Sequence, residues 1–166
     1  MDAPRGPREV CSRLPMEIVH VTSPDDPHVA EYRAVRDRDA LGTDGRPGLF
    51  VGESPLVIEA MFATGTEVLS VLTAERNRDR AVAMVRDATR PGTPPPVVLV
   101  APDDVLDAIV GFNIHRGFLA VGRRPRVRTP AELLAPAGVD SLLLCIEEVN
   151  NIDNIGQLFR NAAAFG

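Results

Sequence analysis

The 166-residue chain carries a formal net charge of −5, with 45% hydrophobic and 4% aromatic residues; this length allows one ordinary domain and part of another, with an aliphatic core. The acidic balance argues against a general nucleic-acid coat protein. Because no apolar run reaches the ~20 residues of a membrane span and the N-terminus lacks the apolar segment of a signal peptide, we predict a cytoplasmic protein that contacts no membrane.

The first part of the chain predicts an extension followed by an α/β domain. Residues 1–16 are rich in proline and arginine and lack periodicity, which predicts a disordered or upstream extension. Strands are predicted at residues 17–21, 49–51, 67–73, 97–101 and 117–121. Helices are predicted after a turn at residues 23–27, at 55–65, at 75–88 and from 102 onward. This alternation indicates a layered α/β domain over residues 17–123.

A proline-containing linker is predicted at residues 124–140, with one short helical piece at 130–134. Every basic residue of the chain is arginine, whose guanidinium matches phosphate bidentately. Several arginines crowd the end of the domain and the linker: Arg116, Arg123, Arg124, Arg126 and Arg128. They are candidate contacts to RNA phosphates; a solvated linker that happens to be basic is the alternative.

The C-terminal residues 141–166 predict a strand, a polar loop and a helix, the first half of a βαβ unit. The apolar run at 142–146 is typical of a strand buried on both faces. Asp153 or Asn154 can cap the helix, and Gly166 stands where a C-cap glycine is expected. One face of this helix carries Ile155, Leu158, Phe159 and Ala162.

The residues that commonly bind metals are scattered along the chain. Cys11 and Cys145 lie one near each end and form neither a disulfide framework nor a ligand set. His20, His28 and His115 show no ligand spacing. We therefore predict reduced thiols and no metal site.

The pattern Asn154-x-Gly156-x-x-x-Arg160, behind an apolar run and the acids Glu147 and Glu148, resembles the first motif of the SpoU (TrmH-like) family of RNA ribose 2′-O-methyltransferases, in the SPOUT class. The resemblance extends over roughly residues 17–166. The segment from Arg33 to Arg38, then Phe50 to Glu53 and a helix, is similar to the opening of the family's N-terminal domain, and residues 116–121 are similar to its closing strand. Ile152 and Asn161 depart from the family, in which many members have Pro and Thr.

The resemblance implies a small α/β/α sandwich that binds RNA at residues 17–123, a linker, and at 141–166 the start of a truncated SPOUT domain. The family's knot and later motifs, which supply most of the S-adenosylmethionine pocket, are absent from this sequence. We therefore assign no cofactor-binding residue. Family members form homodimers through the knot, so we do not predict a homodimer for this chain. We predict the RNA-binding N-terminal part of an rRNA or tRNA ribose 2′-O-methyltransferase, inactive as this chain. The alternatives are a non-catalytic RNA-binding module and a truncated product without function.

The resemblance also implies roles for the motif residues. Arg160 would contact RNA phosphate and help to deprotonate the ribose hydroxyl, and Asn154 would fix the loop as a catalytic-site residue. Because free guanidinium has a pKa above ~12, charge stabilisation and positioning suit Arg160 better. Gly156 would permit close backbone approach, and Glu148 would orient Arg160 through an ion pair. For each residue there is a simpler alternative. Arg160 would only face solvent, and Asn154 would only cap the helix. Gly156 would only allow packing, and Glu148 would be a solvated loop acid.

Overall fold

The computed structural model describes residues 14–33, 48–111, 114, 116–138, 141, 143–149 and 152–165. The chain forms two compact units, unit 1 (Met1–Arg126) and unit 2 (Val127–Gly166). Several predictions concern positions outside the described residues: the extension up to residue 13, Cys11, residues 34–38, His115 and the helix-end glycine Gly166. None of the described helices is long and apolar enough to cross a membrane.

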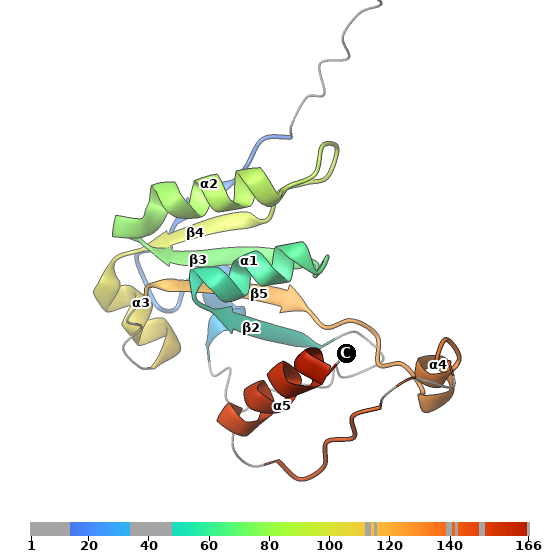
Figure 1. The fold of residues 1–166 in the computed structure, drawn as a ribbon. Helices are drawn as coiled ribbons and strands as arrows, with labels where there is room; N and C mark the ends of the chain where they lie inside the picture. Colours follow the sequence, from blue (N-terminus) through green and yellow to red (C-terminus); the bar gives the residue numbers. More distant parts are fainter. Residues whose placement is uncertain are drawn as a thin grey trace, which may run out of the picture. The chain divides into compact units, whose positions relative to one another are not determined.

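Unit 1 is built on a five-stranded mixed sheet in the order β1-β4-β3-β5-β2 (Figure 1). β1, β4 and β3 are parallel, whereas β5 runs antiparallel to both of its neighbours, β3 and β2. The strands are β1 (Ile18–His20), β2 (Leu49–Glu53), β3 (Val68–Ala74), β4 (Val97–Ala101) and β5 (Phe118–Arg123). The helices are η1 (Pro27–Tyr32), α1 (Pro55–Ala63), η3 (Glu75–Asn77), α2 (Arg78–Ala88) and α3 (Asp103–Val110). The predicted α/β fold is confirmed, with a 3-10 helix after the turn at residues 23–27.

Side-chain alternation along the central strands sends apolar residues to both faces of the sheet. In β3, Leu72 joins one apolar cluster and its neighbour Val71 joins the other. In β4, Leu99 and Val98 divide in the same way. These strands are apolar at consecutive positions because both of their faces are covered. Burial on two sides therefore explains the unbroken apolar runs of the sequence.

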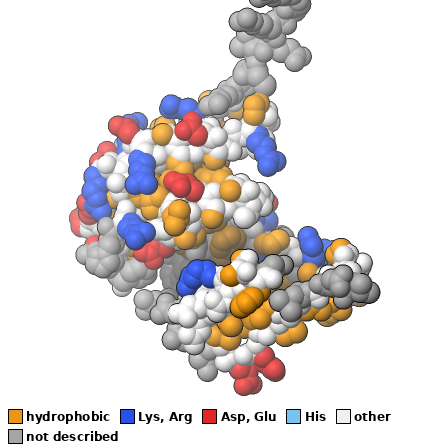
Figure 2. Space-filling model, viewed as in Figure 1, with side chains coloured by type: hydrophobic (Ala, Val, Ile, Leu, Met, Phe, Trp, Pro, Cys, Tyr) orange, Lys and Arg blue, Asp and Glu red, His pale blue; other side chains and the backbone are white. Residues whose placement is uncertain are grey.

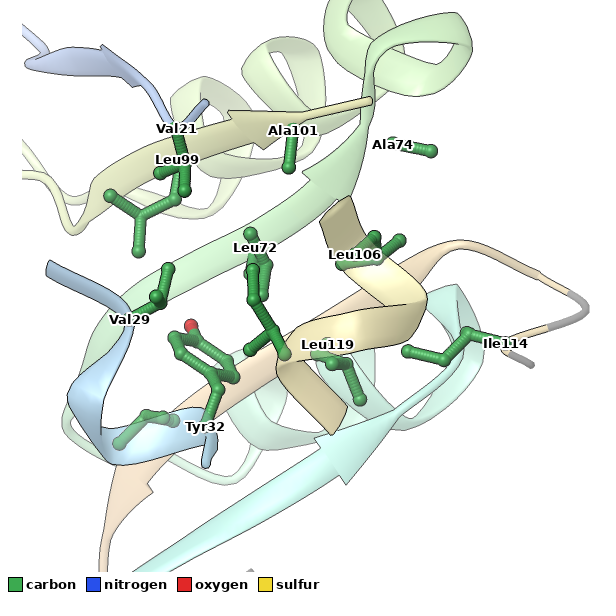
Figure 3. Packing of buried hydrophobic residues seen from close by; sticks show 12 residues of the cluster. Val21, Val29, Tyr32, Leu72, Ala74, Leu99, Ala101, Leu106, Ile114 and Leu119 are labelled. Carbon is green, nitrogen blue, oxygen red and sulfur yellow. The ribbon is translucent and has the colours of Figure 1, made fainter. Parts of the chain in front are cut away.

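Helices cover the sheet on both faces. η1 and α3 pack on one face through a cluster that includes Val29, Tyr32, Leu72 and Leu106 (Figure 3). α1 and α2 cover the other face through Ile58, Met61, Ala81 and Val85, which meet Val98 and Phe118 of the sheet. Unit 1 is thus an α/β/α arrangement with an aliphatic core, as its composition requires.

Tyr32 closes the core on the η1 side. Its side chain is fully buried, and its hydroxyl lies 2.8 Å from Ser70 Oγ on β3. Burial raises the pKa of the Tyr32 hydroxyl far above its ordinary value, and the hydrogen bond with Ser70 partly offsets this. The Tyr32–Ser70 bond satisfies two polar groups that would otherwise be buried without partners.

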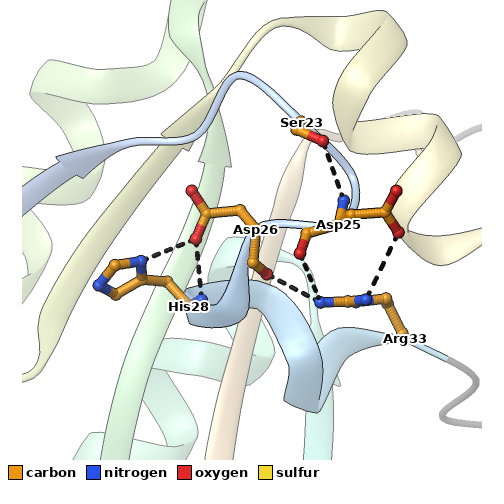
Figure 4. A network of polar contacts seen from close by, with 5 residues as sticks. All are labelled: Ser23, Asp25, Asp26, His28 and Arg33. Atoms are coloured by element: carbon orange, nitrogen blue, oxygen red, sulfur yellow. Dashed lines mark hydrogen bonds and ion pairs between the residues drawn. The ribbon is translucent and has the colours of Figure 1, made fainter.

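A polar network holds the turn that leads into η1 (Figure 4). Asp26 Oδ1 accepts the backbone N–H of His28 at 2.9 Å and lies 2.7 Å from His28 Nδ1. The backbone hydrogen bond, and then the ring contact, lower the pKa of the Asp26 carboxyl. Arg33 Nη2 donates to the carbonyls of Asp25 and Asp26 at 3.2 and 2.8 Å. Arg33 therefore stabilises this turn, whereas the family resemblance places it at the opening of an RNA-binding domain.

Unit 2 contains two helices, α4 (Pro130–Leu134) and α5 (Ile152–Phe165). α4 begins with a capping box: Thr129 Oγ1 accepts the Glu132 N–H at 3.3 Å, and Glu132 Oε2 accepts the Thr129 N–H at 2.8 Å. Such reciprocal bonds satisfy donors that the first turn of a helix leaves free. This explains why a short helix forms at residues 130–134, where it is predicted.

The buried strand predicted at residues 142–146 is wrong. The described residues of this run, 143–146, belong to no strand. Leu143, Leu144 and Ile146 are 60%, 47% and 39% exposed. The physical reason is that a strand requires a neighbour for its backbone hydrogen bonds, and no described segment pairs with this one.

Candidate functional site

The arginines that are close together in sequence are separated by β5. Arg116 precedes the strand, whereas Arg123 ends it and Arg124 follows. A strand of this length places its two ends roughly 20 Å apart. Arg128 belongs to unit 2. Within unit 1 the structure therefore does not gather the predicted RNA-binding arginines into one basic surface, and Arg116 has to be considered apart from Arg123 and Arg124.

Arg116 lies at the sheet edge where β3 and β4 end. Asn77 Nδ2 donates to the Arg116 carbonyl at 3.1 Å. Arg76, which follows β3, forms an ion pair with Asp103, which begins α3. Because an acid neutralises Arg76, this edge carries mixed charge. The Arg116 side chain is exposed there.

Arg123 and Arg124 lie at the other end of β5. Arg123 Nε donates to Glu67 Oε2 at 3.0 Å. The Arg124 backbone N–H donates to the Gly48 carbonyl at 2.8 Å. Arg124 Nε is buried and finds no hydrogen-bond acceptor in the described part of the chain. These arginines line a surface hollow, the β5-end depression, together with Thr64, Gly65, Thr66, Glu67 and Pro125.

Arginines also occupy the α2 side of unit 1, interspersed with acids (Figure 2). Arg78 Nη1 lies 3.2 Å from Asp79 Oδ1. The guanidinium carbon of Arg80 lies 5.5 Å from the centroid of the Phe118 ring, as in a cation–π contact. These arginines therefore have local partners, and the α2 side presents no continuous basic surface.

The motif residues Asn154, Gly156 and Arg160 all lie on α5. The helix begins at Ile152, so Asn154 is inside its first turn. The prediction that Asp153 or Asn154 caps the helix is therefore wrong, since a cap precedes the first helical residue. The Asn154 side chain is exposed.

The Arg160 side chain folds back along α5 onto Gly156. An added Cβ at Gly156 would lie 3.3 Å from Arg160 Nη1 and 3.9 Å from its Cζ. Residues four apart share one face of a helix, and long helical side chains lean toward the N-terminus. The missing side chain of Gly156 therefore makes room for the guanidinium, a relation between two motif residues that the sequence spacing permits but does not specify.

Glu148 does not orient Arg160. Its backbone φ of 49° lies in the left-handed region, and its side chain is exposed. Glu148 and Arg160, which are both described, form no ion pair with each other. Of the two interpretations of Glu148, the solvated loop acid therefore agrees with this structure and the ion pair with Arg160 does not.

The described side chains of unit 2 are all at least partly accessible to solvent. Every described side chain from residue 127 to 165 is exposed or half-buried. A pocket for S-adenosylmethionine has to bury most of a molecule of that size, so the described residues of unit 2 do not fit this cofactor. Among the residues that the structure describes, no three potential metal ligands lie together, and Cys145 is an exposed free thiol.

Comparison with known proteins relates the chain to RNA methyltransferases. No protein-family model matches it. It is 30% identical over 161 residues to an uncharacterized tRNA/rRNA methyltransferase of Mycobacterium bovis, and equally to one of Mycobacterium tuberculosis; these matches cover 92% of this chain and 51% of each relative. An rRNA methyltransferase crystal structure from Sinorhizobium meliloti matches 67% of this chain and 39% of its own, with a TM-score of 0.49 and 15% identity. A second crystal structure, the AdoMet-bound rRNA methyltransferase from the same organism, has a TM-score of 0.48 and 15% identity, over 66% of this chain and 38% of its own. The chain thus spans about half the length of the curated relatives it matches, and over most of its own length it is similar to proteins named as tRNA/rRNA methyltransferases.

Proposed function

We propose that this chain is the RNA-binding N-terminal part of a SpoU-type, S-adenosylmethionine-dependent ribose 2′-O-methyltransferase that acts on rRNA or tRNA. The observation that carries this proposal is the 30% identity, across 92% of the chain, to proteins named as tRNA/rRNA methyltransferases. The helix that bears Asn154, Gly156 and Arg160 adds support, because the three residues keep the spacing of the family's first motif. In this proposal unit 1 binds RNA and α5 contributes one arginine to the catalytic site.

Arg160 is proposed to hold an RNA phosphate. Guanidinium stays charged at neutral pH and presents a planar fork of donors that matches a phosphate. The guanidinium lies beside Gly156 and is exposed, so a phosphate can reach it. A held phosphate fixes the neighbouring ribose hydroxyl, and positioning of this kind is a large part of catalysis for a group transfer. Arg116, Arg126 and Arg128 are proposed as further RNA contacts.

We further propose that the isolated chain binds RNA but does not methylate it. The reason is that no described side chain of unit 2 is buried, so a cofactor would find no enclosed site there. Incubation of the chain with isotopically labelled S-adenosylmethionine and bulk tRNA or rRNA should give no incorporation above a protein-free blank. A gel-shift assay of the same mixture should show a protein–RNA complex. Robust methyl incorporation would contradict the inactivity, and the absence of any complex would contradict RNA binding.

Gly156→Ala is expected to stabilise α5 while weakening RNA binding. Alanine is favoured over glycine inside a helix by about 0.5–1 kcal/mol, but its Cβ would come within 3.3 Å of Arg160 Nη1. The guanidinium must therefore shift by a few tenths of an ångström, and the affinity for tRNA should fall, but by less than in Arg160→Ala. Circular dichroism reports the helix content, and fluorescence anisotropy reports the affinity. Gln157→Ala, at an exposed neighbouring position, should raise helix content without changing affinity; wild-type affinity in Gly156→Ala would refute the positioning role.

A further inference from the structure

The turn that follows α1, residues 64–66, lines one side of the β5-end depression. The Thr66 N–H donates to the Met61 carbonyl at 3.0 Å, and the Gly65 N–H donates to the Phe62 carbonyl at 3.1 Å. Gly65 has a φ of 75°. This pair of bonds with a left-handed glycine is the Schellman motif, which ends many helices. The turn that carries Thr64 and Thr66 therefore has a defined conformation.

Gly122 lets that turn lie against β5. An added Cβ at Gly122 would be 2.6 Å from Met61 Cε and 3.0 Å from Thr66 Cγ2, so a larger residue here would press on both side chains. Thr64 Oγ1 donates to the Ala60 and Met61 carbonyls at 2.9 and 3.1 Å and lies 3.3 Å from Thr66 Oγ1. Since the Thr64 proton is engaged by these carbonyls, the Thr66 hydroxyl is the donor in the 3.3 Å contact, and it has to exchange that long contact for one to a ligand.

The charges at the depression favour an anion. Two guanidinium groups, those of Arg123 and Arg124, line it together with one carboxylate, that of Glu67. The carboxylate engages Arg123 at 3.0 Å. Arg124 Nε is buried and has no acceptor among the described residues. The Arg124 side chain as a whole is half-buried and lines the depression, so an anionic oxygen there can accept from the donors of its guanidinium that remain accessible.

We infer that the β5-end depression is a subsite for one backbone phosphate of the RNA, bound by Arg124 and Thr66, and that Glu67 holds Arg123 until the phosphate replaces its carboxylate. This inference rests on the proposed RNA-binding function. Arginine forks and hydroxyl donors are common partners of RNA and DNA phosphates. Glu67 opposes binding, because the phosphate has to compete with it for Arg123. The sequence alone does not predict this site, because Thr66 and Glu67 are far from Arg123 in the chain.

Three substitutions in the full chain test the subsite, with labelled bulk tRNA as the probe and fluorescence anisotropy across salt as the measurement. Arg124→Ala should weaken binding about threefold to tenfold and lower the salt slope by about one, as for the loss of one phosphate contact. Thr66→Val keeps the branched shape against Gly122 and should weaken binding about threefold through the lost hydroxyl. Glu67→Gln keeps an acceptor for Arg123 but removes the competing charge, and should tighten binding about threefold.

Two control variants make the same charge changes at positions near β1. Arg90→Ala matches Arg124→Ala, and Glu17→Gln matches Glu67→Gln. Both side chains are exposed, and Arg90 lines a separate groove that includes Ile18. β1 is separated from β5 by β4 and β3, which corresponds to about 14 Å between strands. Arg90→Ala and Glu17→Gln should therefore change the affinity less than about twofold, because screening weakens charge effects over that distance. Thermal melts monitored by circular dichroism establish that each variant is folded.

The outcomes separate this subsite from the proposed function. If wild-type chain binds tRNA but Arg124→Ala and Thr66→Val behave like Arg90→Ala, the subsite is refuted and RNA binding stands. Equal affinities for Glu67→Gln and Glu17→Gln would refute the role of Glu67. If wild-type chain binds no tRNA at low salt, both the subsite and the proposed function fail.

Discussion

Tyr32→Ala is expected to lower the free energy of unfolding of unit 1 by about 3–5 kcal/mol, the usual cost of removing a buried aromatic ring. The Tyr32 side chain is 0% exposed and fills the space between η1 and the sheet (Figure 3). Tyr32→Phe is the matched control: it keeps the ring, leaves Ser70 without its partner, and should cost about 1 kcal/mol. Urea unfolding followed by circular dichroism measures both. Equal losses for the two variants would show that the ring does not hold η1 to the sheet.

Ionisation of Tyr32 should lower the free energy of unfolding at alkaline pH. Burial raises the pKa of Tyr32 in the folded state, whereas in the unfolded chain it is about 10. The stabilisation is therefore complete below pH ~10 and is lost as the pH rises toward the folded-state value, by up to about 1.4 kcal/mol per pH unit. The chain has one tyrosine and no lysine, so few other groups titrate in this range. The free energy of unfolding should decline above pH ~10 in the wild type and stay flatter in Tyr32→Phe; parallel declines would contradict the assignment.

Gly117→Ala is expected to cost about 2–3 kcal/mol, because it combines an unfavourable φ with a steric clash. Gly117 has a φ of 61°, and an added Cβ would lie 3.0 Å from Ala74 Cβ. Its carbonyl cannot easily shift, since it accepts the Thr73 hydroxyl and the Ala74 N–H, each at 3.0 Å. The hydrogen bonds between the end of β3 and the residue before β5 therefore depend on glycine at position 117.

Gly92→Ala is the control for Gly117→Ala. Gly92 also has a positive φ, 78°, but an added Cβ would meet nothing within 4 Å. This variant should therefore lose only the about 1 kcal/mol that a left-handed conformation costs an alanine. Urea titrations of both variants measure the difference. If the two losses are the same, the packing against Ala74 is not what requires glycine at position 117.

The strands and helices of unit 1 are predictable because their signals are local. The apolar runs at 97–101 and 117–121 become β4 and β5 within two residues of the expected bounds. Composition alone indicates the aliphatic core. The run at 142–146 carries the same local signal but forms no strand in its described residues, because strand formation depends on a neighbour and not on the run itself.

The site is less predictable because its residues come together only through tertiary structure. Sequence proximity suggests that Arg116 and Arg123 act together, but β5 extends between them and places them at opposite ends. Thr66 joins Arg124 because Gly122 leaves room for it, a contact that no local pattern reveals. The relation of Gly156 to Arg160 is partly predictable, since their spacing puts both on one helix face. The start of α5 is not predicted, since α5 begins at Ile152 and Asn154 lies inside the helix.

RNA binding by this chain is the central claim, and the affinity of the full chain for tRNA across a salt series tests it most directly. Each phosphate that arginine neutralises releases counterions, so the logarithm of the association constant should fall linearly with the logarithm of the salt concentration. We predict a complex at low salt and a slope that corresponds to several phosphate contacts. The absence of a complex at low salt, or an affinity that does not change with salt, would contradict it.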